Sequence, residues 1–315
     1  MSIKQKILFV LLVVLPGGIL QIGAQTRITL GDRPKVNAVE AGERPSSSTK
    51  YSEAEEKKYL SLITSAYRQL LADSMLKAEK LFVEAVDFLP GHPSNAEAYF
   101  QLGCIAEQKE VYEDALEYYR KALRINENLA KVYERRGAVN LILKNYRPAL
   151  RDYSSLLELR PGNAQAYFYL GYAYQQLNMS EEALGSYAKA VAVDPSFADA
   201  HAARAVLKAR RGDVVSALSI MDSLVSCHPD KAELYSVRGS IEAEAGKDKL
   251  ALYDFTKAID LLPTVATNYV SRATIYRRMG KDVLADNDLK QAAALGANAL
   301  LVENARKPAE NGNKQ

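Results

Sequence analysis

The side chains that most often carry catalysis or bind metals are few in this sequence. Its 315 residues include three histidines and two cysteines, namely His92, His201, His228, Cys104 and Cys227. A nucleophilic site needs a base within hydrogen-bonding reach of the nucleophile, and a zinc site needs closely spaced cysteine and histidine ligands. None of the histidines stands near a cysteine, a serine or an acid at a spacing that repeats a known catalytic or metal-ligand arrangement, and neither cysteine suggests a metal site. We therefore expect no catalytic residues, no metal and no cofactor.

The acidic pairs, the glycines and the cysteines fit structural positions instead. Glu181 and Glu182 fall in the first turn of a predicted helix, where acids complement the positive end of the helix dipole. No run of glycines resembles a phosphate-binding loop. Cys104 and Cys227 lie in separate units of the repeat described next, so we expect two unpaired thiols.

A period of 34 residues runs through most of the chain and decides how the other side chains are positioned. Six alanines recur at this interval: Ala115, Ala149, Ala183, Ala217, Ala251 and Ala285. Four prolines keep the same interval: Pro161, Pro195, Pro229 and Pro263. A fixed period of this length is typical of stacked repeats, in which each unit packs only on its neighbours. The product is an extended surface suited to holding another molecule.

Each period contains two predicted helices. In residues 164–197, apolar and small side chains recur at helical spacing from Tyr167 to Tyr174 and again from Ala183 to Ala190. The second run ends at Pro195, because proline lacks a backbone N–H and disfavours a helical residue before it. Small residues in both helices allow the helix axes to approach closely. Each unit is therefore predicted to be a helix–turn–helix hairpin.

This pattern resembles the tetratricopeptide repeat family. One unit carries the family's residues in order, as Tyr167, Leu170-Gly171, Tyr174, Ala183, Tyr187, Ala190 and Pro195. The resemblance implies an all-α fold, a right-handed superhelical solenoid of about seven antiparallel hairpins within residues 52–299. The units lie near residues 59–92, 96–129, 130–163, 164–197, 198–231, 232–265 and 266–299, and the first unit is degenerate.

One departure from the family pattern recurs within the chain. An arginine replaces the usual apolar residue before the glycine or alanine of the first helix, at Arg136, Arg204, Arg238 and Arg272. Three of these units also carry an aspartate sixteen residues later, at Asp152, Asp254 and Asp288. We predict an arginine–aspartate pair that ties the two helices together. Arg204 has Ile220 in the acceptor position, and Asp222 is its candidate substitute.

The first 24 residues are typical of a secretory signal peptide. Lys4 and Lys6 precede a short apolar core from Ile7 to Leu15, and Ala24 offers a small residue for cleavage. The core is shorter than the roughly 20 apolar residues of a membrane span, although an uncleaved anchor is the alternative. No cysteine lies near the cleavage point for lipid attachment. We expect an exported chain without an integral membrane span, in a Gram-negative-type periplasm, or secreted to the medium or the cell surface.

Two segments flank the array. Residues 25–51 hold few large apolar groups and are predicted to be a disordered linker. Ser52 and Glu55 form a predicted capping box that begins the first helix. Residues 300–315 are predicted to be a short cap, with Leu300, Leu301 and Val302 folded onto the last hairpin, and a disordered tail. Because so short a cap leaves apolar surface exposed, self-association at this end is a secondary hypothesis.

Charge and resemblance together favour a protein partner. The net charge of +3 falls to +1 when Lys4 and Lys6 are removed with the signal peptide, which gives no reason to expect nucleic acid or an anionic membrane. In the family, the first helix of each hairpin lines a concave groove that holds peptides. The resemblance thus implies a non-enzymatic scaffold or adaptor that binds a protein or peptide segment.

The candidate partner-binding residues lie on the predicted first helices. They are Gln101, Lys131, Arg135, Tyr169, Tyr172, Gln175, Gln176 and Arg277. Aromatic anchors beside amides and charges suit peptide recognition. The alternative is a carbohydrate- or peptidoglycan-binding module, in which the aromatic rings stack on sugars. Exported relatives commonly serve envelope assembly, secretion or surface attachment, and the resemblance implies such a function here.

Overall fold

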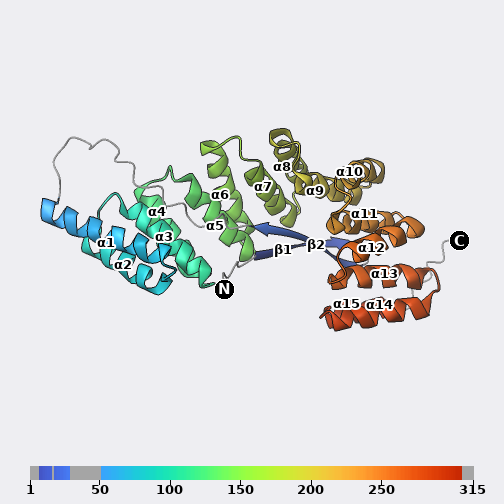
Figure 1. Ribbon diagram of the computed structural model, residues 1–315. Coiled ribbons are helices and arrows are strands. Elements are labelled where there is room, and N and C mark those ends of the chain that lie inside the picture. Colours follow the sequence, from blue (N-terminus) through green and yellow to red (C-terminus); the bar gives the residue numbers. More distant parts are fainter. Residues whose placement is uncertain (1–6, 16–17, 29–50, 307–315) are drawn as a thin grey trace. The chain divides into compact units, whose positions relative to one another are not determined.

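The computed structural model describes residues 7–15, 18–28 and 51–306, and Figure 1 shows their secondary structure. The helices of this described part are α1 (Glu53–Leu71), α2 (Met75–Phe88), α3 (Asn95–Gln108), α4 (Tyr112–Ile125), α5 (Ala130–Ile142), α6 (Tyr146–Leu159), α7 (Ala164–Gln176), α8 (Ser180–Val193), α9 (Ala198–Arg210), α10 (Val214–Cys227), α11 (Ala232–Glu244), α12 (Asp248–Leu261), α13 (Ala266–Arg278), α14 (Asp282–Ala294) and α15 (Ala299–Arg306).

Consecutive helices pack as pairs and form a helical-repeat solenoid. Direct contacts join α1 with α2, α3 with α4, α5 with α6, α9 with α10, α11 with α12 and α13 with α14, and α7 and α8 occupy the fourth period. We call the two members of each pair the first and second helix of repeats 1 to 7. The predicted all-α repeat fold is therefore confirmed for residues 53–306, whereas its right-handed sense stays a prediction.

The chain divides into two compact units. The first holds the helices from α1 to Ser186 within α8, and the second holds β1, β2 and the helices from Tyr187 onward. Each unit is described by itself below.

The N-terminal described residues form a hairpin that the all-α prediction did not include. Strands β1 (Ile7–Leu15) and β2 (Gly18–Ile28) pair antiparallel, with an irregularity in register between Phe9 and Leu11. Isoleucine, valine, leucine and phenylalanine dominate β1, and β-branched and aromatic residues favour strands. The signal peptide of residues 1–24 stays a prediction. Among the described residues, no helix combines the length and the apolar character that crossing a membrane requires.

The ends of the array follow the predicted boundaries where they are described. The Ser52 hydroxyl accepts from the Glu55 backbone N–H, and the Glu55 carboxylate accepts from the Ser52 backbone N–H at 2.7 Å, which confirms the capping box. Residues 29–50 of the predicted linker and residues 307–315 of the predicted tail lie outside the described residues.

Small residues bring the two helices of a repeat together. All six alanines of the 34-residue series are fully buried. A Cβ atom added to Gly103 would lie 2.3 Å from a ring carbon of Tyr119, and one added to Gly137 would lie 3.0 Å from the ring of Tyr153. Glycine is therefore required at Gly103, because the ring of Tyr119 occupies the space of a methyl group.

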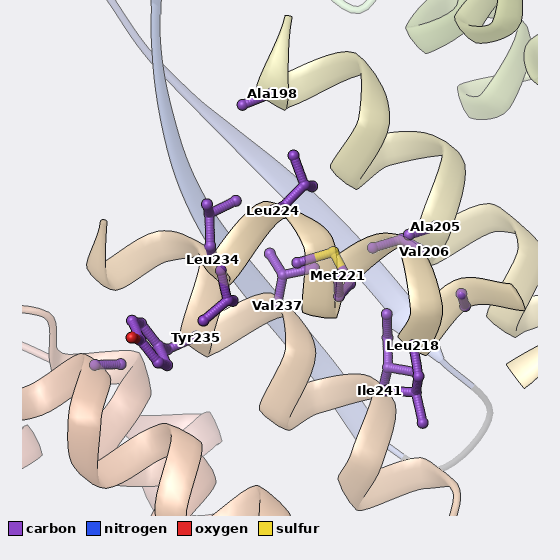
Figure 2. Close-up of a cluster of buried hydrophobic side chains, with 13 residues drawn as sticks. Ala198, Ala205, Val206, Leu218, Met221, Leu224, Leu234, Tyr235, Val237 and Ile241 are labelled. Atoms are coloured by element: carbon purple, nitrogen blue, oxygen red, sulfur yellow. The ribbon is translucent and has the colours of Figure 1, made fainter. Parts of the chain in front are cut away.

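Several apolar clusters in each unit join neighbouring repeats. Figure 2 shows a cluster of the second unit in which Met221 of α10 lies among side chains of α9, α10 and α11. Leu224, Val237 and Ile241 belong to this cluster and are buried. Such packing couples repeat 5 to repeat 6, as expected of an array whose stability is shared between neighbours.

Three of the recurrent arginines form the predicted pairs. The pairs are Arg136–Asp152, Arg238–Asp254 and Arg272–Asp288. In repeat 6, Arg238 donates from Nε to Asp254 Oδ2 at 2.7 Å and from Nη2 to Oδ1 at 2.8 Å, which is a bidentate pair. Asp222, the candidate substitute acceptor for Arg204, instead accepts from Nη1 of Arg238 at 2.8 Å. That expectation was wrong because the aspartate faces the next repeat.

Helix α15 covers the last hairpin only in part. Val302 is 5% exposed and packs with Ala273, Ala285 and Leu289 of repeat 7. Leu300 is 56% exposed, so the prediction that it folds onto the hairpin was wrong. The physical reason is helical geometry, since residues two positions apart point to opposite sides of a helix.

Candidate functional site

First helices of adjacent repeats contact one another in both units, and these contacts bring some of their polar side chains together. Contacts join α3 with α5 in the first unit, and α9 with α11 and α11 with α13 in the second. We define the first-helix face of the first unit by Glu97, Gln101, Cys104, Glu107, Lys131, Arg135, Tyr169, Tyr172, Gln175 and Gln176. This surface includes every predicted site residue except Arg277.

Glu97 joins repeats 2 and 3 at one end of this face. The Lys131 ammonium donates to Glu97 Oε2 at 2.5 Å, and the Gln101 amide donates to Glu97 Oε1 at 3.0 Å. Lys131 Nζ also lies 4.5 Å from the ring centre of Phe100. The side chains of Lys131 and Glu97 are 41% and 38% exposed, whereas Gln101 is buried. The structure thus brings two predicted residues together around one acid, and the ion pair remains accessible to solvent.

Glu107 joins the same two repeats in a buried setting. Its carboxylate accepts from the Tyr119 hydroxyl at 2.7 Å and from Arg135 Nη1 at 3.2 Å. Burial raises the pKa of Glu107 to about 6, although Arg135 and the Tyr119 hydroxyl act in the opposite direction. Arg135 is therefore held in place by an acid whose own orientation is fixed by Tyr119.

Cys104 lies beside this acid, and its thiol is expected to be unreactive. Its Sγ lies 3.6 Å from the Tyr119 hydroxyl oxygen. The residue is partly exposed, but the thiol itself sits among buried groups, and this burial raises its pKa to about 12. The thiol stays protonated at neutral pH, so it is a poor nucleophile and a poor metal ligand.

The predicted aromatic residues of α7 are packed rather than open. Tyr169 and Tyr172 are 5% and 8% exposed. The ring of Tyr169 lies 5.4 Å from that of Tyr153, and the ring of Tyr172 lies 6.5 Å from that of Tyr146, both on the preceding second helix. Burial also raises the pKa of Tyr172 to about 12. These rings build the wall of the face and offer little surface for stacking.

The two glutamines of α7 differ in exposure. Gln175 is buried, and Gln176 is half-buried at the end of α7. Gln176 therefore offers a polar group at the edge of the face.

Arg277 belongs to the second unit and is paired within its own repeat. It donates to Asp282 at 2.9 Å and to Asp286 at 2.5 Å, both on α14. Its charge is neutralised by the second helix of repeat 7, so we leave it out of the candidate face.

Sequence reasoning missed Glu97 and Glu107 as parts of this face, and Tyr119 as the residue that orients Glu107. The signal for Glu97 was present, because it stands one 34-residue period before Lys131 and opposite charges at equivalent places meet on adjacent helices. Glu107 had no such signal, since its partners Tyr119 and Arg135 lie at irregular spacings. Its position became clear only from the packing of three helices.

The face supports binding chemistry. Among the described residues, no group of histidine, cysteine and acidic side chains could hold a metal ion. What the face presents is an accessible ion pair, a fixed arginine and polar amides on three consecutive repeats.

Comparison with known proteins agrees with this architecture. Two models described as the tetratricopeptide repeat match residues 96–129 and 164–197, with the bounds predicted for the second and fourth units. A tetratricopeptide repeat protein from Parabacteroides merdae superposes with a TM-score of 0.68 at 26% identity, covering 79% of this chain and 98% of that one. This chain contains tetratricopeptide repeats.

Other solved structures resemble parts of the chain. A double mutant of MamA RS-1 matches with a TM-score of 0.50 at 25% identity, over 54% of this chain and 93% of that one. PilW, a widely conserved type IV pilus biogenesis factor, matches with a TM-score of 0.56 at 19% identity, over 63% of this chain and 92% of that one. No curated protein matches the sequence significantly.

Proposed function

We propose that this tetratricopeptide repeat protein is a non-enzymatic scaffold that binds an extended protein segment on the first-helix face of repeats 2 to 4. The observation that carries the proposal is the pair of links between successive repeats, Lys131–Glu97 and Arg135–Glu107. Both links run between α3 of repeat 2 and α5 of repeat 3, so they place charged donors and acceptors next to one another on adjacent first helices. An extended segment that crosses these helices offers backbone and side-chain groups to pair with them.

The two links are suited to different tasks. The Lys131–Glu97 pair is partly exposed, and such pairs stabilise a fold by only about 0–1 kcal/mol. A carboxylate or a carbonyl of a bound segment can therefore replace Glu97 as the partner of Lys131 at little cost. Arg135 is anchored by the buried Glu107, and its side chain is 20% exposed, so a ligand can reach part of the guanidinium.

The burial of the aromatic rings favours a protein segment over a sugar. Phe168, Tyr169 and Tyr172 are all less than a tenth exposed. A sugar-binding module needs an open ring face for stacking, and these rings present none. We therefore retain the scaffold and do not propose the carbohydrate- or peptidoglycan-binding alternative.

Export to the periplasm or the cell surface is part of the proposal. Its support is the sequence of residues 1–24, with two lysines, an apolar core and a small residue at the expected cleavage point. In this location the scaffold would serve envelope assembly, secretion or surface attachment. Mass spectrometry of the chain recovered from the producing cell tests export, with Gln25 expected at its N-terminus.

Self-association through the C-terminal end is a second proposal. It is supported by Val283, Leu284 and Leu300, which are 74%, 44% and 56% exposed on α14 and α15. Light scattering on the purified chain and on a Val283→Asp variant tests it. We expect a concentration-dependent dimer that the variant loses, and a monomer at all concentrations would contradict it.

Site-specific photo-crosslinking tests the scaffold. A photoreactive benzoylphenylalanine at Gln176, on α7, should crosslink a protein partner in cells. The matched control is Arg151, an exposed residue on the second helix α6. Crosslinks at both positions, or at Arg151 alone, would contradict binding on the first-helix face.

A further inference from the structure

One arginine of the chain lacks the acceptors that its three counterparts have. Arg136, Arg204, Arg238 and Arg272 occupy the same register position on the first helices of repeats 3, 5, 6 and 7. We call these residues the arginine row. Three of them donate to an aspartate on the second helix of their own repeat, sixteen residues later. The exception is Arg204 of repeat 5.

Both places that supply acceptors to the row are changed around Arg204. Arg238 donates to Asp254, sixteen residues after it, and to Asp222, sixteen residues before it. The corresponding residues for Arg204 are Ile220 and Ala188, which have no side-chain acceptor. Repeat 5 thus has the arginine but no acidic side chain at either acceptor position.

Arg204 consequently carries an uncompensated charge. It makes no hydrogen bond or ion pair with another described residue, and its Nε is buried without a partner. The guanidinium cannot shed its proton near neutral pH, and a buried N–H without an acceptor is unfavourable. The rest of the guanidinium is not fully covered, since Arg204 is half-buried overall.

No acid on its own helix neutralises Arg204. The single acid of α9, Asp199, is turned by about 140° around the helix axis. Lys208, one turn after Arg204, donates to Asp213 at 2.8 Å, so the acid that follows the helix is already paired. His201, one turn before, contacts the Pro195 carbonyl at 3.0 Å. None of these neighbours on or next to α9 supplies an acceptor to the Arg204 side chain.

The helix packed against α9 carries small polar residues and one apolar residue near the register position of the missing aspartate. Helix α10 packs against α9 and presents the exposed residues Ser219 and Ser223 beside the half-buried Ile220. Small hydroxyl side chains leave the guanidinium approachable, and Ile220 offers apolar contact to the stem of an approaching side chain. A free inorganic anion would use only the charge.

We propose that Arg204 is a docking point for an acidic side chain, aspartate or glutamate, of a partner protein. The carboxylate binds the terminal guanidinium nitrogens and supplies from outside the acceptor that Asp152, Asp254 and Asp288 give to Nη2 in the other repeats, while the buried Nε of Arg204 stays without one. This site is separate from the first-helix face, so its failure would leave the scaffold proposal unaffected.

Nuclear magnetic resonance of the arginine Nε–H groups tests the site directly. The probe is the peptide acetyl-Gly-Glu-Gly-amide, with acetyl-Gly-Gln-Gly-amide as the uncharged counterpart and sodium chloride at matched ionic strength as the simple anion. We expect the glutamate peptide to shift the Arg204 signal saturably and to leave Arg238, already bound to Asp254, unchanged. Neither the glutamine peptide nor chloride should produce that shift.

Two variants supply the missing acceptor from within. Ile220→Asp copies the partner of the other arginines, and Ala188→Asp, at an exposed position, copies Asp222 without disturbing the core. Either variant should abolish the response of Arg204 to the glutamate peptide. An unresponsive Arg204 in the parent chain, an equal response to chloride or the glutamine peptide, or an undiminished response in a folded variant would overturn the proposal.

Discussion

Repeats 2 and 6 join their two helices by different chemistry at the same positions. Repeat 6 uses the bidentate pair of Arg238 with Asp254, and its buried ring, Phe255, has no hydroxyl. Repeat 2 has Leu102 in place of the arginine and Tyr118 in place of the aspartate. It joins its helices through Tyr119, whose ring packs on Gly103 and whose hydroxyl donates to Glu107.

The comparison shows that the residue at the Tyr119 position and the residue at its acceptor position differ together between these two repeats. Where Tyr119 has a hydroxyl, Glu107 accepts from it, and where Phe255 has none, Ala243 replaces the acid. Repeat 3 breaks the set, because it keeps Tyr153 but has Leu141 at the acceptor position. The hydroxyl of Tyr153 is accordingly buried without a partner. Added side-chain volume at the helix contact should therefore destabilise repeat 2 most. Removal of one charge of the ion pair should destabilise repeat 6 most.

The largest effect is expected from breaking the ionic tie of repeat 6. Arg238→Leu leaves Asp254, which is 1% exposed, without its main partner, and we expect a loss of about 3–5 kcal/mol. Adding Asp254→Tyr, which copies Leu102 and Tyr118 of repeat 2, should recover much of that loss. Urea denaturation of both single variants and the double variant gives the coupling energy. Additive single effects would show that the two residues do not act as a pair.

The steric tie of repeat 2 should be nearly as sensitive. Gly103→Ala forces a methyl group to within 2.3 Å of the buried Tyr119 ring, and overpacking of this kind costs about 1–3 kcal/mol. Gly239→Ala is the matched control, because its nearest neighbour would lie 3.1 Å away. The comparison of the two repeats fails if both variants lose the same stability in urea denaturation.

Removing the hydroxyl groups of two buried tyrosines compares a hydroxyl that has a hydrogen-bond partner with one that has none. Tyr119→Phe leaves the buried Glu107 with one donor fewer, and we expect a loss of about 1–3 kcal/mol. Tyr153→Phe removes a buried hydroxyl that has no partner, so stability should stay level or rise. Thermal unfolding of the two variants beside the parent chain is sufficient. Equal losses would mean that the Glu107 hydrogen bond contributes nothing.

The smallest effect concerns the pH dependence of repeat 6. Asn140 donates to Asp152 at 2.9 Å in repeat 3, whereas repeat 6 has Glu242 at that register position beside Asp254. Burial, with the nearby charge of Asp254, raises the pKa of Glu242 to about 7 from its ordinary 4.5. The protonated carboxyl is favoured by folding, so its contribution is complete below about pH 4.5 and lost as the pH rises through 7.

Glu242→Gln should replace this acid with a permanent donor. We expect the variant to match the parent at pH 5 and to exceed it by about 1 kcal/mol at pH 8.5, after allowance for solvent screening. Urea denaturation at the two pH values measures the difference. A variant whose advantage is the same at both pH values would contradict the assignment.

The fold could be predicted from the sequence because its determinants are local and periodic. The 34-residue interval fixes which alanines are buried, and the sixteen-residue interval fixes the partners of Arg136, Arg238 and Arg272. Aperiodic contacts escaped the prediction. Asp222 faces the following repeat, and Glu107 meets Tyr119 and Arg135 at spacings that no repeat implies. The exposure of Leu300 depended on the orientation of one short helix.

The sequence predicted on which helices the site residues lie, but not how buried their side chains are or which partners they contact. Lys131, Arg135, Gln101 and Tyr172 lie on first helices, as the register implies, but the sequence does not reveal that Glu107 pairs with Arg135. Nor does it reveal that the ring of Tyr172 is buried against Tyr146. Such states depend on which helices face one another across a repeat boundary.

Hydrogen–deuterium exchange with a bound peptide tests the central claim most directly. The ligand is a peptide selected from a random display library on the purified chain, and exchange is followed in every helix with and without it. Binding on the first-helix face should slow exchange in α3, α5 and α7 and leave α2, α4 and α6 unchanged. Protection confined to the second helices, or a selected peptide that protects none of these helices, would contradict it.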